Sequence, residues 1–106
     1  MDKRAAVRVP VRVRAQCRSN GIVIDGLVVD VSRSGLFLRA SHSIREGTPA
    51  ELDLDLPGEA VLRMPVEVVR VERGPRGIGM GLRFVGRSER RRPLANFIMR
   101  QHQISR

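Results

Sequence analysis

The chain has 106 residues, 42% of them hydrophobic and 29% charged, and Cys17 is its one cysteine. This composition is typical of a single globular domain, and it excludes an intrinsically disordered chain and a disulfide-stapled scaffold. The formal net charge of +9 predicts attraction to a polyanion or to a phosphorylated ligand. No apolar run approaches a membrane span, and no signal-peptide pattern follows Met1, so the sequence predicts a cytoplasmic protein.

The positive charge is concentrated in two terminal segments. Residues 1–18 hold six basic residues and one acidic residue, a net +5, and residues 83–106 hold seven and one, a net +6. The intervening residues 19–82 hold seven basic and nine acidic residues, a net −2. All but one of the basic residues are arginine, whose planar fork suits phosphate groups and the guanine edge. A high genomic GC content would favour the same residue, so arginine abundance alone does not identify a ligand.

Hydrophobic periodicity predicts short β-strands along most of the chain. Three valines between residues 9 and 13 alternate with other residue types, which indicates a half-buried strand. The leucines of "AELDLDL" alternate with two aspartates, so we expect the leucines to face a core and the aspartates to face solvent. The other predicted strands are 22–31, 35–40, a long strand or bent pair within 60–73, and 78–85, the last with Gly79 and Gly81 on one face.

Helical spacing occurs in the C-terminal segment, where Leu94, Phe97 and Ile98 recur at intervals of three and four. Ser88 is a candidate N-cap. Pro93 fits poorly five residues past that cap, which favours an irregular first turn or a start about two residues before the proline. The order of elements predicts a mainly β protein, a small six-stranded antiparallel β-barrel with a C-terminal α-helix.

Catalytic chemistry finds little support in the sequence. His42 and His102 have no cysteine or carboxylate at metal-ligand spacing, and we interpret them as ordinary surface histidines. Cys17 has no neighbouring histidine and is expected to be buried at the end of a strand. Asp53 and Asp55 share the outward face of a predicted strand, so solvation explains both. The sequence therefore predicts a protein that is not an enzyme.

The apolar pattern breaks most sharply at Asp30-Val31-Ser32-Arg33-Ser34-Gly35, between two predicted strands. A tight turn needs only Gly, Asn or Asp, so an acid, two hydroxyls, an arginine and a glycine together raise the prospect of a ligand. A simpler interpretation stays open at this point. Asp30 and Ser32 could close an Asx- or ST-turn, with Gly35 in a left-handed conformation.

Two motifs of the chain together resemble those of PilZ domains. Arg4 and Arg8 form R-x-x-x-R, and D-x-S-x-x-G follows at residues 30–35. Other arginine pairs also match the first pattern, but "RVPV" begins at Arg8, as it often does in the family just before the first strand. "GMGLRF" at residues 79–84 is similar to the glycine-rich final strand of the family, and the resemblance spans residues 3–103.

The resemblance implies one domain with a flexible N-terminal arginine loop at residues 1–8, a barrel at 9–86 and a helix at 87–103. PilZ domains bind the bacterial second messenger cyclic di-GMP, so the resemblance implies a bacterial signalling receptor with this ligand and no cofactor. The ligand-binding residues that it implies are Arg4, Arg8, Asp30, Ser32 and Gly35, with Lys3, Arg33 and Gly81 as secondary candidates.

These residue types fit the ligand chemically. An arginine fork can pair with guanine O6 and N7, and its remaining donors can reach phosphate. Asp30 can accept from guanine N1–H and N2–H, and Ser32 can donate or accept at the same edge. Gly35 allows a positive φ and a close approach of ligand to backbone. Ligand contacts from the arginines would order the N-terminal loop against the barrel and change the surface offered to a protein effector.

Two other functions remain open. A PilZ-like domain that has lost its ligand could act only as a protein-interaction adaptor. A nucleic-acid-binding barrel is disfavoured, because single-strand binders stack bases on exposed aromatic side chains. The chain has no Trp or Tyr, and Phe37, Phe84 and Phe97 occupy expected core positions. The sequence does not identify the effector, and it is compatible with a monomer or a ligand-dependent dimer.

Overall fold

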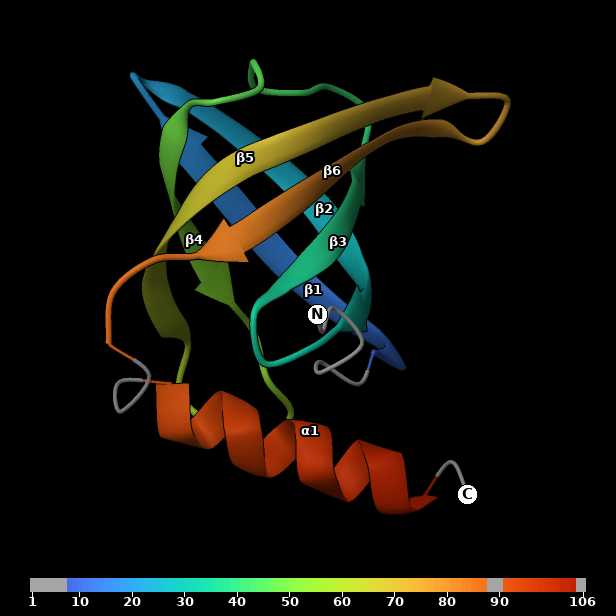
Figure 1. The fold of residues 1–106 in the computed structure, drawn as a ribbon, viewed down its shortest axis with the longest axis vertical. Coiled ribbons are helices and arrows are strands. Elements are labelled where there is room, and N and C mark those ends of the chain that lie inside the picture. The colour runs from blue at the N-terminus through green and yellow to red at the C-terminus, as the bar shows by residue number, and fades with distance from the viewer. Residues whose placement is uncertain (1–7, 88–90, 105–106) are drawn as a thin grey trace, which may run out of the picture.

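The structure, a computed structural model, describes residues 8–87 and 91–104. Within these residues, six antiparallel strands close into one barrel in the order β1-β2-β3-β6-β5-β4, and one helix follows (Figure 1). The predicted fold class is therefore confirmed. The elements are β1 (Val9–Ser19), β2 (Ile22–Val31), β3 (Gly35–Ala40), β4 (Pro49–Leu54), β5 (Leu62–Gly74), β6 (Gly77–Phe84) and α1 (Arg92–Ile104).

Alternate side chains of the strands fill the barrel interior. In β4, Leu52 and Leu54 are buried, while Asp53 between them faces the outer surface, as the alternation predicts. Leu56, just beyond the strand, is also buried. Because the barrel is closed, each of its six strands is hydrogen-bonded to a neighbour on both sides, and none of these described strands has an open edge. The outer face of the strands is therefore the surface on which this fold can present polar groups.

The helix α1 lies across one end of the barrel, while the β5–β6 hairpin extends beyond the other end (Figure 1). Leu94, Phe97 and Ile98 join the common hydrophobic core, which confirms the helical face predicted from their spacing. Leu94 and Phe97 line a small apolar cavity together with Val13 and Leu36, where the helix covers the barrel. The helix thereby removes the apolar end of the barrel from water.

The helix begins at Arg92, inside the predicted segment 87–103. Pro93 therefore occupies the first turn, where its missing N–H would have no intrahelical partner in any case. The predicted cap, Ser88, lies outside the described residues. Among the described helical residues, no stretch has the length and hydropathy that a membrane crossing requires.

Candidate functional site

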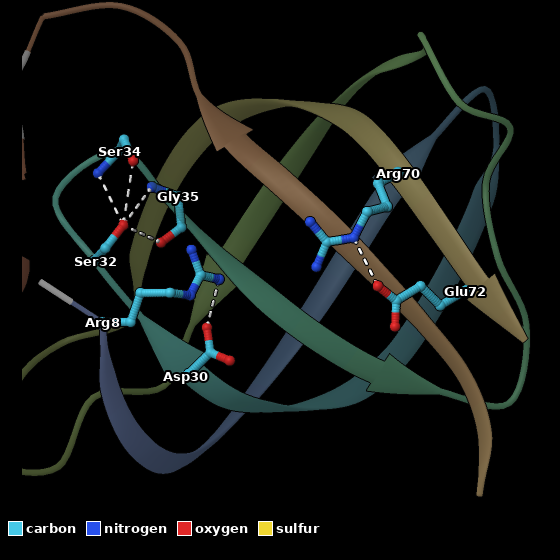
Figure 2. A network of polar contacts seen from close by, with 7 residues as sticks. All are labelled: Arg8, Asp30, Ser32, Ser34, Gly35, Arg70 and Glu72. Carbon is cyan, nitrogen blue, oxygen red and sulfur yellow. Dashed lines mark hydrogen bonds and ion pairs between the residues drawn. The ribbon is translucent and has the colours of Figure 1, made fainter. Parts of the chain in front are cut away.

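The candidate site begins where the chain enters the barrel. Arg8 directly precedes β1, and its Nη2 donates a hydrogen bond to Oδ1 of Asp30 in β2 at 2.6 Å (Figure 2). Strand pairing brings Arg8 and Asp30 close, because Asp30 is the Cα partner of Pro10, which lies two residues after Arg8. The Arg8 and Asp30 side chains are 51% and 31% exposed. An ion pair this exposed contributes at most about 1 kcal/mol to stability, so a ligand can compete for both partners.

Among the residues that the structure describes, the Arg8–Asp30 contact leaves most of the hydrogen-bonding capacity of both side chains unused. It engages one nitrogen of the guanidinium and one oxygen of the carboxylate. The second oxygen of Asp30 can still accept, and the other N–H groups of Arg8 can still donate. The pair therefore offers a ligand donors and an acceptor side by side.

Ser32 organises the β2–β3 turn from the inside. Its side chain is completely buried, and its Oγ accepts hydrogen bonds from the backbone N–H of Ser34 at 3.2 Å and of Gly35 at 3.3 Å. The N–H of Ser32 also donates to the carbonyl of Gly35 at 2.8 Å. This arrangement is the ST-turn that the sequence left open (Figure 2). In this conformation the Ser32 hydroxyl is directed into the turn and away from the outer surface.

Gly35 is required by close packing and not by its backbone angle. The φ angle of Gly35 is not positive, which corrects the expectation of a left-handed conformation. A Cβ on Gly35 would lie 2.2 Å from the carbonyl oxygen of Leu82 in β6. The missing side chain lets β3 approach β6 at this point. The turn that carries the D-x-S-x-x-G motif is therefore seated directly against the final strand.

Four residues on four neighbouring strands form one row across the outer face. Asp30 in β2 is the Cα partner of Phe37 in β3, Phe37 is the partner of Gly81 in β6, and Gly81 is the partner of Arg70 in β5. We call Asp30, Phe37, Gly81 and Arg70 the outer row. Adjacent strands lie about 4.8 Å apart, so the backbone of the outer row spans about 14 Å. Figure 2 shows Asp30 beside Arg8 at one end and Arg70 beside Glu72 at the other.

Two β-bulges turn the ends of the outer row toward the surface. The strand register shifts between Val28 and Asp30 in β2, and between Val68 and Arg70 in β5. Val28 and Val68 are buried, so uninterrupted alternation would direct both charged residues into the core. Both bulges share one sequence signature, two valines followed by a charged residue. This signature could have identified Arg70, which was not among the predicted site residues.

The prediction that Phe37 occupies a core position is wrong, because its side chain does not belong to the barrel interior. It is only 7% exposed, yet its two chain neighbours fill the core while its own ring lies on the outer face against Gly79. A Cβ on Gly79 would lie 2.2 Å from the ring. The guanidinium carbons of Arg39 and Arg70 lie 5.9 and 5.4 Å from the ring centroid. The Phe37 ring is therefore buried outside the core, between the backbone at Gly79 and the side chains of Arg39 and Arg70.

The remaining predicted site residues have different surroundings. Lys3 and Arg4 lie outside the described residues. Arg33 is exposed in the β2–β3 turn, and no hydrogen bond or ion pair joins it to another residue that the structure describes. Gly81 is buried beneath Arg70, whose side-chain atoms would lie 3.5–3.7 Å from an added Cβ. These are ordinary contact distances, so Gly81 lies directly beneath the Arg70 side chain on the outer row.

Other ionisable groups have structural explanations. Hydrogen bonds from Arg63, together with one from Arg18, lower the pKa of the Asp53 carboxyl against the opposing effect of burial. Burial raises the pKa of the Cys17 thiol to about 11, although the charge of Arg18 opposes this. A thiol with that pKa is a poor nucleophile at neutral pH. The described part of the chain contains no group of three residues able to hold a metal ion.

Comparisons with known proteins agree with this barrel. The chain is similar to MotI/DgrA, the inhibitor of motility of Bacillus subtilis, with a TM-score of 0.84 at 19% sequence identity. That match covers 100% of this chain and 54% of the other, so this chain spans about half the length of MotI/DgrA. The PilZ domain of YcgR from Escherichia coli, solved with c-di-GMP (cyclic di-GMP), gives a TM-score of 0.82 at 12% identity. It covers 99% of this chain and 95% of that domain.

A third solved structure is the PilZ domain of CeSA from a cellulose-synthesizing bacterium, with a TM-score of 0.68 and 18% identity. It covers 88% of this chain and 95% of that domain. A comparison with curated protein sequences finds no match. The family model of the PilZ domain matches residues 2–100. The chain therefore belongs to the PilZ domain family.

Proposed function

We propose that this protein is a cyclic di-GMP receptor that binds its ligand on the outer face of the barrel, beside Arg8 and the outer row. The Arg8–Asp30 contact carries the proposal. It joins residues of the two family motifs, 22 positions apart in the chain, at one accessible point on the barrel. The PilZ domain of YcgR, which has the same fold, was solved with c-di-GMP, and this supports the same ligand here.

The chemistry of the ligand matches the groups at this point. Cyclic di-GMP carries two phosphates and two guanines, and therefore needs cations together with groups that read a guanine edge. We assign the phosphate contacts and the bidentate contact with guanine O6 and N7 to Arg4 and Arg8. The oxygen of Asp30 that Arg8 does not engage accepts from guanine N1–H and N2–H. Ser32 and Gly35 act by holding the turn in shape, with Lys3 and Arg33 as further cations near the phosphates.

The proposed mechanism is a switch and includes no chemical step, so the protein is not an enzyme. Ligand contacts from Arg4 and Arg8 tie the residues before β1 to the barrel and alter the surface offered to a partner. The partner in this proposal is a protein effector in a bacterial cytoplasm. The structural similarity to MotI/DgrA, named as an inhibitor of motility, supports a regulatory role of this kind for the chain. The receptor acts as a monomer or as a ligand-dependent dimer.

Calorimetric titration tests the proposal. Cyclic di-GMP is titrated into the wild type, Arg8→Ala, Asp30→Ala and a matched control, Arg63→Ala, with GTP as the control ligand. Arg63 is also an exposed arginine in an ion pair, but its partner is Asp53, outside the outer row. Hydrogen bonds to charged groups contribute about 1.5–3 kcal/mol each, so we expect about tenfold to hundredfold weaker binding for Arg8→Ala and Asp30→Ala.

The control variant should bind cyclic di-GMP as tightly as the wild type, and the GTP titration should show no binding. Absence of cyclic di-GMP binding by the folded wild type would refute the receptor function. The ligand-free adaptor would then be the better account, since the same barrel could contact a protein partner without a nucleotide.

A further inference from the structure

Arg70 is the cation of the outer row that the family motifs do not include. Its side chain extends over Gly81, and its guanidinium carbon lies 5.4 Å from the centroid of the Phe37 ring. Its Nε donates to Oε2 of Glu72 at 2.8 Å (Figure 2). The side chain is nevertheless 52% exposed. Arg70 is therefore supported from below by a ring and a glycine, and it remains open to solvent.

The contacts of Arg70 leave its recognition groups available. Glu72 engages Nε, and no hydrogen bond joins the two terminal nitrogens to any other residue that the structure describes. A guanidinium is planar and stacks on flat rings, and its terminal nitrogens match phosphate and the guanine edge. The supported plane of Arg70 can accept a flat base on its solvent side.

The bulge in β5 indicates that the exposure of Arg70 has a role other than stability. Without the register shift between Val68 and Arg70, the side chain would point into the core. The bulge instead brings it to the surface, where an exposed pair with Glu72 adds little to folding stability. The equivalent bulge in β2 presents Asp30 in the same manner at the other end of the outer row. Bulges that re-aim a side chain are frequent beside functional sites.

We propose that Arg70 is a further ligand-binding residue, whose guanidinium, supported by Phe37 and Gly81, stacks on one guanine base of cyclic di-GMP. This inference rests on the proposed function and extends the site across β5. The ligand has two bases, so one meets Asp30 and Arg8 while the other meets Arg70. Gly81 lies directly beneath the Arg70 side chain, whose atoms would be 3.5–3.7 Å from a Cβ at that position.

The test compares cyclic di-GMP affinity for the wild type, Arg70→Ala, Arg70→Lys and Arg63→Ala. Arg63 is the matched control, because it lies on the same strand in an ion pair with Asp53. Base stacking on a side chain is worth enough that Arg70→Ala should weaken binding about tenfold to hundredfold. Arg70→Lys keeps the charge without the plane and should recover little of this loss. Arg63→Ala should leave the affinity unchanged, and all variants should retain the wild-type circular dichroism spectrum.

The possible outcomes separate this inference from the proposed function. If the wild type binds and Arg70→Ala binds equally well, the role of Arg70 is refuted while the receptor function stands. If Arg70→Lys binds like the wild type and Arg70→Ala does not, Arg70 acts as a charge and the stacking role is refuted. A folded wild type that does not bind would refute the receptor function and this extension together.

Discussion

The contact between β3 and β6 predicts that Gly35→Ala strongly destabilises the fold. The added Cβ would lie 2.2 Å from the carbonyl oxygen of Leu82 and 3.2 Å from its carbonyl carbon. Close carbon–oxygen contacts between strands lie near about 3.3 Å, so one backbone must shift by about 1 Å. Leu82 is paired on one side with Leu36 and on the other with Val68, which restrains such a shift.

Overpacking of a well-packed site costs about 1–3 kcal/mol, and a clash with paired backbone belongs at the upper end of that range. At about 4–8 °C for each kcal/mol, we expect the Tm to fall by about 10–20 °C. Thermal unfolding followed by circular dichroism measures this shift.

Gly74→Ala is the control for the Gly35 experiment. Gly74 does not have a positive φ, and an added Cβ would meet nothing within 4 Å. The Tm of this variant should stay within a few degrees of the wild type or rise slightly. Alanine lowers the conformational entropy of the unfolded chain, which stabilises the fold by about 0.4–1 kcal/mol. If Gly35→Ala unfolds at the same temperature as Gly74→Ala, the close approach of β3 to β6 is wrong.

Three further perturbations have defined outcomes. Glu72→Gln removes a negative charge beside Arg70 while keeping an acceptor for its Nε, and calorimetry should record about twofold to fivefold tighter cyclic di-GMP binding; weaker binding would contradict this. Burial raises the pKa of Cys17 from 9.0 to about 11, so its neutral thiol stabilises the fold below pH 9 and this contribution is lost as the pH rises toward 11. The urea midpoint should therefore fall across that interval in the wild type and fall less in Cys17→Ala, and equal slopes would contradict the assignment. The hydrogen bond from Arg63 lowers the pKa of Asp53 below 3.8, so the associated stability is present above pH 3.8 and is lost as the pH falls through the lowered value. An NMR titration should give a higher Asp53 pKa in Arg63→Ala than in the wild type, and an unchanged pKa would count against the contact.

The strands were largely predictable because local signals mark their ends. The predicted segments 22–31 and 35–40 coincide with β2 and β3. Turn-forming residues delimit both, and Asn20 and Gly21 adopt the positive φ that a tight turn before β2 requires. The helix start was less definite, because Ser88 is a candidate N-cap whereas Pro93 fits poorly in a helix that starts there.

The arrangement of the site was less predictable, because it depends on contacts between distant strands. The D-x-S-x-x-G motif identified the β2–β3 turn, but the need for Gly35 arises from the backbone of β6. The run of three apolar residues at 36–38 has no alternation, so the sequence could not indicate that Phe37 faces outward. Strand alternation would place Arg70 in the core, and the bulge that brings it to the surface is not part of that pattern. Pairing partners, and not composition, decide which side chains share the outer row.

The location of the ligand is tested most directly by an amide NMR titration of the wild type with cyclic di-GMP. The account predicts that the perturbed amides cluster in the 30–35 turn and along the outer row at Phe37, Gly81 and Arg70. The amides of Gln16 and Asp53, on the β1–β4 face, should be unaffected. Perturbations centred on that face, or none at saturating ligand, would contradict the proposed site.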